Sequence, residues 1–126
     1  MSIGPSETPL FFLDCCALAD SQFHNNYKAA IPTNYKLISN IIAAPESFPE
    51  YLGFIIKSDV NIIVAFRCIK TIFDWIESGK VDQTIFEFCT NSGKTHRGFT
   101  EIYTSCRNQI FEILSKLGDN YNLYIT

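Results

Sequence analysis

The chain has 126 residues, of which 47% are apolar and 14% aromatic, a composition that predicts one globular core and argues against disorder. The net charge is −3 and no long basic run occurs, so we expect no binding to nucleic acid. Only 18% of the residues are charged. This low fraction predicts that part of the apolar surface meets a partner or the rest of a longer chain.

The N-terminus has no basic region followed by an apolar stretch, so we expect no signal peptide and a cytoplasmic location. The longest apolar run, residues 62–66, is far too short to span a bilayer. The five cysteines are odd in number and form no C-x-x-C pair, which indicates neither a disulfide framework nor a zinc site. Asp14, Asp20 and Asp74 share no metal-ligand spacing, and we expect neither a metal nor a cofactor.

A helix at residues 6–23 is the first expected element, with Ser6 as its cap and Pro9 in its first turn. Its Cys15-Cys16 pair is interpreted as two small buried hydrophobic residues. The helix is expected to end in the polar, asparagine-rich segment that follows.

A β-rich segment at residues 35–44 ends before Pro45, and residues 46–51 are predicted to form a loop. Residues 53–57 and 61–66 then have the pattern of two strands joined by a tight turn. The second strand is apolar on both faces, as expected of a central strand that is covered on both sides.

A short helix is expected next, between a T-x-x-D capping box at Thr71 and Asp74 and a stop at Gly79. Its large apolar side chains are Phe73, Trp75 and Ile76. We interpret them as packing under the preceding loop, and contact with a lipid substrate or a lid is the alternative.

Residues 84–89 alternate as an edge strand, and residues 91–93 form a turn. A long helix follows, with Lys116 in its last turn and Gly118 at its end. Its apolar face repeats at spacings of three and four. That face consists of Phe99, Ile102, Tyr103, Cys106, Ile110, Ile113, Leu114 and Leu117. The last expected element is a strand at residues 121–126.

Strands that alternate with helices predict the α/β class, with a mainly parallel sheet and flanking helices. The strand at residues 121–126 has nothing after it to cover it. An exposed strand edge templates pairing with another chain, so we expect self-association through this strand.

Four pieces of the sequence occur in a specific order: Phe66-Arg67 at the end of a buried strand, Asp74-Trp75, the segment His96-Arg97-Gly98-Phe99, and the final strand ending at Thr126. This order, over about residues 34–126, resembles the class 3 (fungal-type) lipases. Those are serine esterases of the α/β-hydrolase fold. Their pattern is a strand ending in F-R-G-T or F-R-G-S, a D-W or N-W pair, an H-x-G-F segment, and a strand leading into G-H-S-L-G-G.

The resemblance implies that the nucleophilic serine would follow Thr126, on the tight turn that the glycines of the elbow permit. In the α/β-hydrolase order the acid and the histidine come later still. We therefore expect a single, truncated lipase-like domain over residues 1–126, with a partial α/β-hydrolase fold that is incomplete at its C-terminus. Without nucleophile, base and orienting acid, no acyl transfer is expected from it.

The resemblance also implies an altered oxyanion loop. The family's Gly-Thr or Gly-Ser pair falls on Cys68-Ile69. In the family the hydroxyl residue contributes its backbone N–H and side chain to the oxyanion hole, and an acidic residue nine positions later steadies it. That later position is Ser78 here. Loss of one such donor costs on the order of 3 kcal/mol of transition-state stabilisation.

His96 is interpreted as a structural residue that hydrogen-bonds near the start of the long helix, because its family counterpart is not the catalytic histidine. His24 is interpreted as a solvated loop residue. A thiol nucleophile at Cys68 with His96 as its base is the alternative. No neighbouring motif supports activation of that thiol, so an ordinary substitution is favoured.

The leading hypothesis is the N-terminal part of a class 3 lipase-like carboxylester hydrolase, inactive alone, whose family substrate is a lipid or short acyl ester. The open alternative is a non-catalytic interaction or regulatory domain derived from the same fold. The replacements at Cys68, Ile69 and Ser78 suit relaxed selection on catalysis, as this alternative expects.

Overall fold

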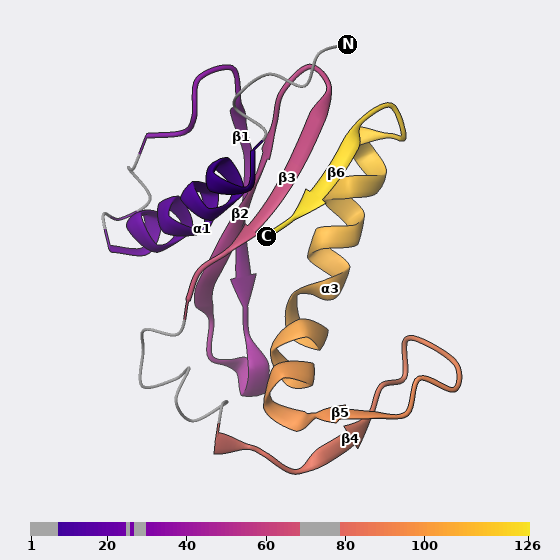
Figure 1. The fold of residues 1–126 in the computed structure, drawn as a ribbon. Helices are drawn as coiled ribbons and strands as arrows, with labels where there is room; N and C mark the ends of the chain where they lie inside the picture. The colour runs from indigo at the N-terminus through magenta and orange to yellow at the C-terminus, as the bar shows by residue number, and fades with distance from the viewer. Residues whose placement is uncertain (1–7, 25, 27–29, 69–78) are drawn as a thin grey trace.

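The computed structural model describes residues 8–24, 26, 30–68 and 79–126 (Figure 1). Its elements are α1 (Pro9–His24), β1 (Lys36–Ala43), the 3₁₀ helix η2 (Pro45–Ser47), β2 (Glu50–Lys57), β3 (Asn61–Phe66), β4 (Gln83–Ile85), β5 (Lys94–His96), α3 (Arg97–Leu117) and β6 (Asn122–Ile125). The short helix predicted between Thr71 and Gly79 falls largely on residues 69–78, which lie outside the described residues.

The main sheet has the strand order β1-β2-β3-β6. β1 pairs with β2 and β2 with β3 in antiparallel fashion, and β3 pairs with β6 in parallel. The sheet is therefore mixed, and the prediction of a mainly parallel sheet is wrong. Parallel neighbours need a crossover of a dozen or more residues. The connections after β1 and β2 are too short for that, and the crossover through α3 joins the parallel pair.

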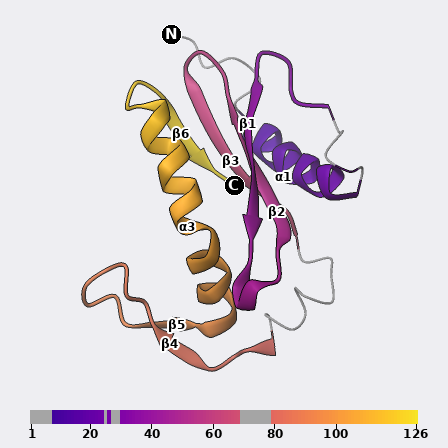
Figure 2. The same ribbon diagram turned by 180° about the vertical axis from the view of Figure 1, so that it is seen from behind.

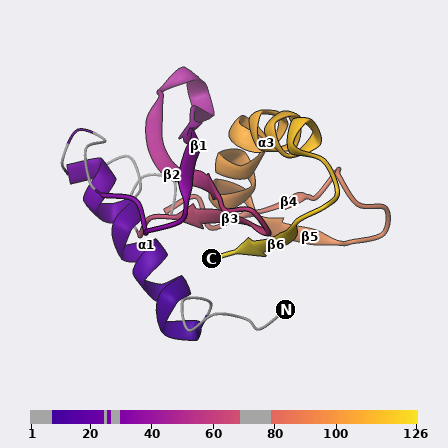
Figure 3. The same cartoon turned by 90° about the horizontal axis from the view of Figure 1, so that it is seen from above.

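The sheet lies between two helices, with α1 against one face and α3 against the other (Figure 3). Alternation along β3 divides its side chains between the two cores. Ile62 and Val64 pack with Cys106 and Ile110 of α3. Ile63 and Ala65 pack with Cys15 and Ala19 of α1. The predicted central strand, covered on both sides, is confirmed.

Gly53 of β2 lies close against the backbone of β3. A Cβ atom built on this glycine would overlap the backbone carbonyl oxygen of Ala65. Gly53 is buried and pairs with Phe66. The absence of a side chain therefore permits the pairing of the two central strands at this point.

The outer edge of β1 is covered by side chains of α3, which runs beside it (Figure 2). The amide of Ala44 donates to Ser105 Oγ at 2.9 Å, and the amide of Ile42 donates to Gln109 Oε1 at 3.2 Å. Gln109 Nε2 in turn donates to the carbonyl of Asn40 at 3.1 Å. Helix side chains here take the place of a neighbouring strand.

Both long helices match their predictions closely. The amide of Phe11 donates to Thr8 Oγ1 in the first turn of α1, while the predicted cap, Ser6, lies outside the described residues. Gly118, at φ 85°, ends α3 as predicted. The prediction of the apolar face of α3 is wrong for one residue. Phe99 is 53% exposed, because it stacks on the ring of His96 in the first turn instead of joining the core.

Two predicted boundaries are wrong. The strand predicted at residues 84–89 is confined to β4, which pairs with β5 in a separate two-stranded sheet. Beyond it, Phe86 and Phe88 leave the strand and pack on Tyr103, with ring centroids 5.8 and 5.6 Å apart. The loop predicted at residues 46–51 is shorter than expected, because η2 occupies its start and β2 begins at Glu50.

Candidate functional site

The carboxyl ends of β3 and β6 lie side by side. The amide of Phe66 donates to the carbonyl of Thr126 at 2.9 Å, and the amide of Thr126 donates to the carbonyl of Val64 at 2.9 Å. In sheets with parallel strands, ligands bind beyond the carboxyl ends of those strands. Arg67 and Cys68, which directly follow β3, and the end of β6 therefore form one candidate site, here called the carboxyl-end site.

Arg67 anchors the loop after β3 from inside the protein. It is 8% exposed. Its guanidinium donates to the carbonyl of Tyr51, and to that of Cys68 at 2.8 Å. The same group lies 4.7 Å from the ring centroid of Phe23 and 3.9 Å from the Glu50 carboxylate. These contacts give this residue of the family motif a positioning role.

Cys68 is exposed, and its amide donates to Asp20 Oδ1 of α1 at 3.0 Å. No local pattern in the sequence pointed to Asp20, because its position depends on how a helix 48 residues away docks on the sheet. Ile69 and Ser78, the other residues of the predicted oxyanion-loop remnant, lie outside the described residues. Their role stays a prediction.

A second residue of α1 reaches the end of β6. Cys16 Sγ lies 3.2 Å from Thr126 Oγ1, and that hydroxyl donates to the carbonyl of Phe12 at 3.3 Å. Both contacts are satisfied when the thiol donates to the hydroxyl. Cys16 is half-buried, whereas its neighbour Cys15 is fully buried. The prediction of a buried pair is thus correct for Cys15 and wrong for Cys16.

His96 caps the N-terminus of α3. Its Nδ1 accepts a hydrogen bond from the amide of Phe99 at 3.2 Å, which is the predicted hydrogen bond near the start of the long helix. Gly98 is buried in the same turn. No hydrogen bond joins Cys68 to His96 within the described part of the chain. Asp74 and Trp75, also in the family motif, lie outside that part.

Two buried thiols, Cys15 and Cys106, are held in the protonated form by their surroundings. Burial, followed by the neighbouring Cys16 and Asp14, raises the pKa of Cys15 to about 11. Burial also raises the pKa of Cys106. All five cysteines are free. Among the residues that the structure describes, no group of three or more side chains could hold a metal ion.

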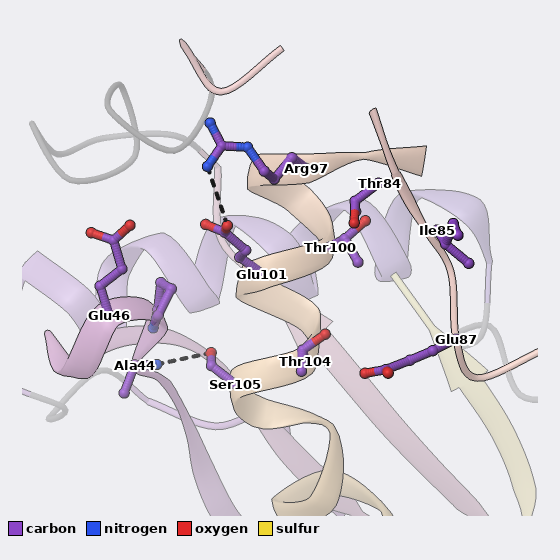
Figure 4. Close-up of a pocket in the computed structure, with 11 residues that line it drawn as sticks. Ala44, Glu46, Thr84, Ile85, Glu87, Arg97, Thr100, Glu101, Thr104 and Ser105 are labelled. Carbon is purple, nitrogen blue, oxygen red and sulfur yellow. Dashed lines mark hydrogen bonds and ion pairs between the residues drawn. The ribbon is translucent and has the colours of Figure 1, made fainter. Parts of the chain in front are cut away.

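A polar hollow of about 530 Å³ lies between η2, β4 and α3 (Figure 4). Arg97 on its wall bonds to Asp82 at 2.7 Å and approaches Glu101 at 3.5 Å. Lys80 bridges Glu46 and Glu101 at 2.7 and 2.9 Å. The hydrogen bond from Arg97 lowers the pKa of Asp82. None of the lining residues belongs to α1, β3 or β6, so the hollow is separate from the carboxyl-end site.

No helix in residues 8–24, 26, 30–68 and 79–126 is long and apolar enough to cross a membrane. Comparison with curated proteins finds no match.

The model of the class 3 lipase family matches residues 63–126, just over half of the chain. The match starts inside β3 and includes α3 and β6, so it covers the parallel strand pair and its crossover. It confirms the resemblance seen in the sequence, over a shorter range than the expected residues 34–126. The chain belongs to the class 3 lipase family.

Proposed function

We propose that this chain carries the central strand, the crossover helix and the nucleophile-side strand of a class 3 lipase-type carboxylester hydrolase, as part of an α/β-hydrolase fold. The supporting observation is the coincidence of the family match with β3, α3 and β6, whose two strands end beside each other. In such a fold, a serine on the turn after β6 would face the loop after β3. The substrate class of the complete site is a lipid or short acyl ester.

The 126 residues alone are proposed to be inactive on esters. A serine esterase places its nucleophile in a G-x-S-x-G turn, with a histidine base and an orienting acid. No serine of this chain lies in such a pattern. One of the two histidines, His96, uses its Nδ1 as a helix cap. The chain therefore has no serine in the family's nucleophile pattern, and one of its two histidines is engaged as a helix cap.

The loop after β3 gives further support. Cys68 and Ile69 stand where the family has Gly-Thr or Gly-Ser, and the amide of Cys68 is bound by the carboxylate of Asp20. An oxyanion hole stabilises negative charge with preorganised donors. The family's donor position falls on Ile69, the next residue, and a carboxylate 3.0 Å from the neighbouring amide of Cys68 opposes a negative charge nearby.

Ester turnover by the purified chain tests the proposal. The substrate is p-nitrophenyl butyrate, and the expected rate equals the buffer blank at every protein concentration. A fluorophosphonate probe, which labels activated serines, should leave the intact mass unchanged. A class 3 lipase assayed in parallel shows that the conditions permit turnover. Hydrolysis that rises with protein concentration and survives purification to homogeneity would refute inactivity.

A non-catalytic interaction or regulatory domain derived from the same fold is the second candidate. The replacements at Cys68, Ile69 and Ser78 favour it, because they alter the loop that catalysis would need. A sharp monomer peak and a cooperative melt support this candidate. Large oligomers and strong dye binding support the incomplete-domain proposal, since Leu123 and Ile125 of β6 are 48% and 68% exposed.

A further inference from the structure

The helix α1 lies outside the family match, yet three of its side chains reach the carboxyl-end site. Cys16 contacts the hydroxyl of Thr126, and Asp20 accepts from the amide of Cys68. Phe23 lies under the Arg67 guanidinium. Each contact joins α1 to a different group at the ends of β3 and β6.

The spacing of these three residues explains how one helix makes all the contacts. Cys16, Asp20 and Phe23 follow one another at intervals of four and three, which places them in one stripe along the helix. The neighbouring stripe is one residue earlier at each position and holds the fully buried residues of α1. These are Cys15, Ala19 and Gln22. One stripe thus fixes α1 on the sheet, and the next faces the carboxyl-end site.

We propose that α1 is a clamp for the carboxyl-end site, and that Asp20 is the residue that positions the backbone of Cys68 just after β3. Its carboxylate makes a charge-assisted hydrogen bond to the amide of Cys68, and such bonds are roughly twice as strong as neutral ones. Cys16 contacts the hydroxyl of Thr126 through a weaker, uncharged thiol hydrogen bond, so the same helix contacts the chain just after both strands. The inference rests on the proposed function for the meaning of the site, but its test needs no catalysis.

Amide hydrogen exchange of Cys68, followed by NMR in the full chain, is the test. In the unaltered protein, this amide should exchange at least tenfold more slowly than an unstructured peptide, although Cys68 is exposed. In Asp20→Ala, its exchange should accelerate at least tenfold, because a bond to a charged acceptor is lost. In Asp20→Asn, whose side-chain oxygen can still accept, exchange should stay within about threefold of the unaltered protein.

Asp14→Ala is the matched control, because Asp14 is an exposed carboxylate on the same helix. It should leave the exchange of Cys68 unchanged. The amides of Phe66 and Thr126, which belong to the β3–β6 ladder, should keep their protection in Asp20→Ala. That result separates a local loss of positioning from general unfolding, which would expose the ladder as well.

The proposal is overturned if Asp20→Ala keeps its ladder and leaves Cys68 exchange unchanged. If that variant does not fold, the exchange rate of the Cys68 amide in the unaltered protein is the deciding measurement. Cys68 exchanging at the unstructured rate excludes the clamp, and slow exchange retained in Asp20→Asn supports it. Ester turnover by the chain would refute the proposed inactivity while leaving these exchange rates as they are. The two proposals therefore fail in different experiments.

Discussion

The two edges of the main sheet are protected to different degrees. At the β1 edge, two backbone groups of the strand bond to Gln109 of α3, and the amide of Ala44, just after the strand, bonds to Ser105. At the β6 edge, Leu123 and Ile125 present large apolar side chains that are 48% and 68% exposed. Unpaired strand edges invite pairing with other chains. One helix thus closes the β1 edge with two polar side chains, whereas the described residues pair β6 with β3 alone.

The comparison teaches that edge protection need not come from a strand or from charged residues. Gln109 supplies both an acceptor and a donor, so one side chain satisfies the amide of Ile42 and the carbonyl of Asn40. This arrangement requires α3 to be held in a defined position beside β1. The apolar contacts of Cys106 and Ile110 with the sheet hold it there. Burial of one face of the helix therefore positions the polar groups beside it.

Disrupting the pairing of β2 with β3 should have the largest effect, because both edges belong to the sheet that this pairing holds together. Gly53→Ala places a methyl group on the carbonyl oxygen of Ala65, where backbone must move. We expect a loss of at least about 3 kcal/mol in the free energy of unfolding, measured by urea denaturation. Gly79→Ala is the control, since a Cβ there meets nothing within 4 Å. Equal stability of the two variants would contradict this account of Gly53.

Opening the β1 edge should have an intermediate effect. The double variant Ser105→Ala with Gln109→Ala removes three hydrogen bonds to the β1 edge. We expect a loss of about 2 kcal/mol on unfolding, at roughly 0.5–1.5 kcal/mol per bond. We also expect new concentration-dependent association in sedimentation velocity. Ser115→Ala, which loses only a bond to Phe111 within its own helix, should show neither change.

Charging the β6 edge should change association with little effect on stability. Lysine at an exposed strand edge disfavours pairing with another chain. Leu123→Lys with Ile125→Lys should therefore shift the sedimentation profile toward monomer, with stability changed by about 0.5 kcal/mol or less. Leu37→Lys on β1 is the matched control and should leave association unchanged. Persistent oligomers in the β6 variant would place the self-association surface elsewhere.

The smallest expected effect is a pH dependence at the polar hollow. The Arg97 hydrogen bond lowers the pKa of Asp82 in the folded protein. Its contribution to stability is therefore present above the unfolded value of about 4 and is lost as pH falls through the lowered folded-state pKa. The difference in Tm between the unaltered protein and Asp82→Asn should shrink as pH drops from 6 to 3. Asp119→Asn, also exposed, should show no such trend.

Local patterns predicted the elements well and their pairing poorly. The three-and-four spacing and Gly118 gave α3 nearly its full length, and the apolar run gave β3 its bounds. The direction of a strand depends on the path of the connection that precedes it. Hydrophobic alternation within a strand carries no information about that path, and only the short links after β1 and β2 do. β4 and β5 have three residues each, too few to show a period.

The candidate site was only partly accessible from the sequence. The motif pointed to Arg67, Cys68 and His96, because these residues lie at the ends of recognisable elements. Asp20 and Cys16 gave no such signal. Their roles arise only when α1 packs on β3. A contact between residues 48 positions apart in the chain produces no periodic pattern in the sequence. Nothing in the pattern of α1 distinguished the stripe that contacts the site from an ordinary polar surface.

The β2–β3 pairing has a consequence for how the family is delimited. The family match begins at Ile63, two residues inside β3, whose antiparallel partner β2 precedes it. A recombinant protein made of residues 63–126 would therefore start within a strand and lack β2, α1 and the glycine that lets the strands approach. The segment that matches the family and the set of strands that pair in the main sheet are different stretches of this chain. Domain boundaries for expression are better drawn from strand partners than from the limits of a sequence match.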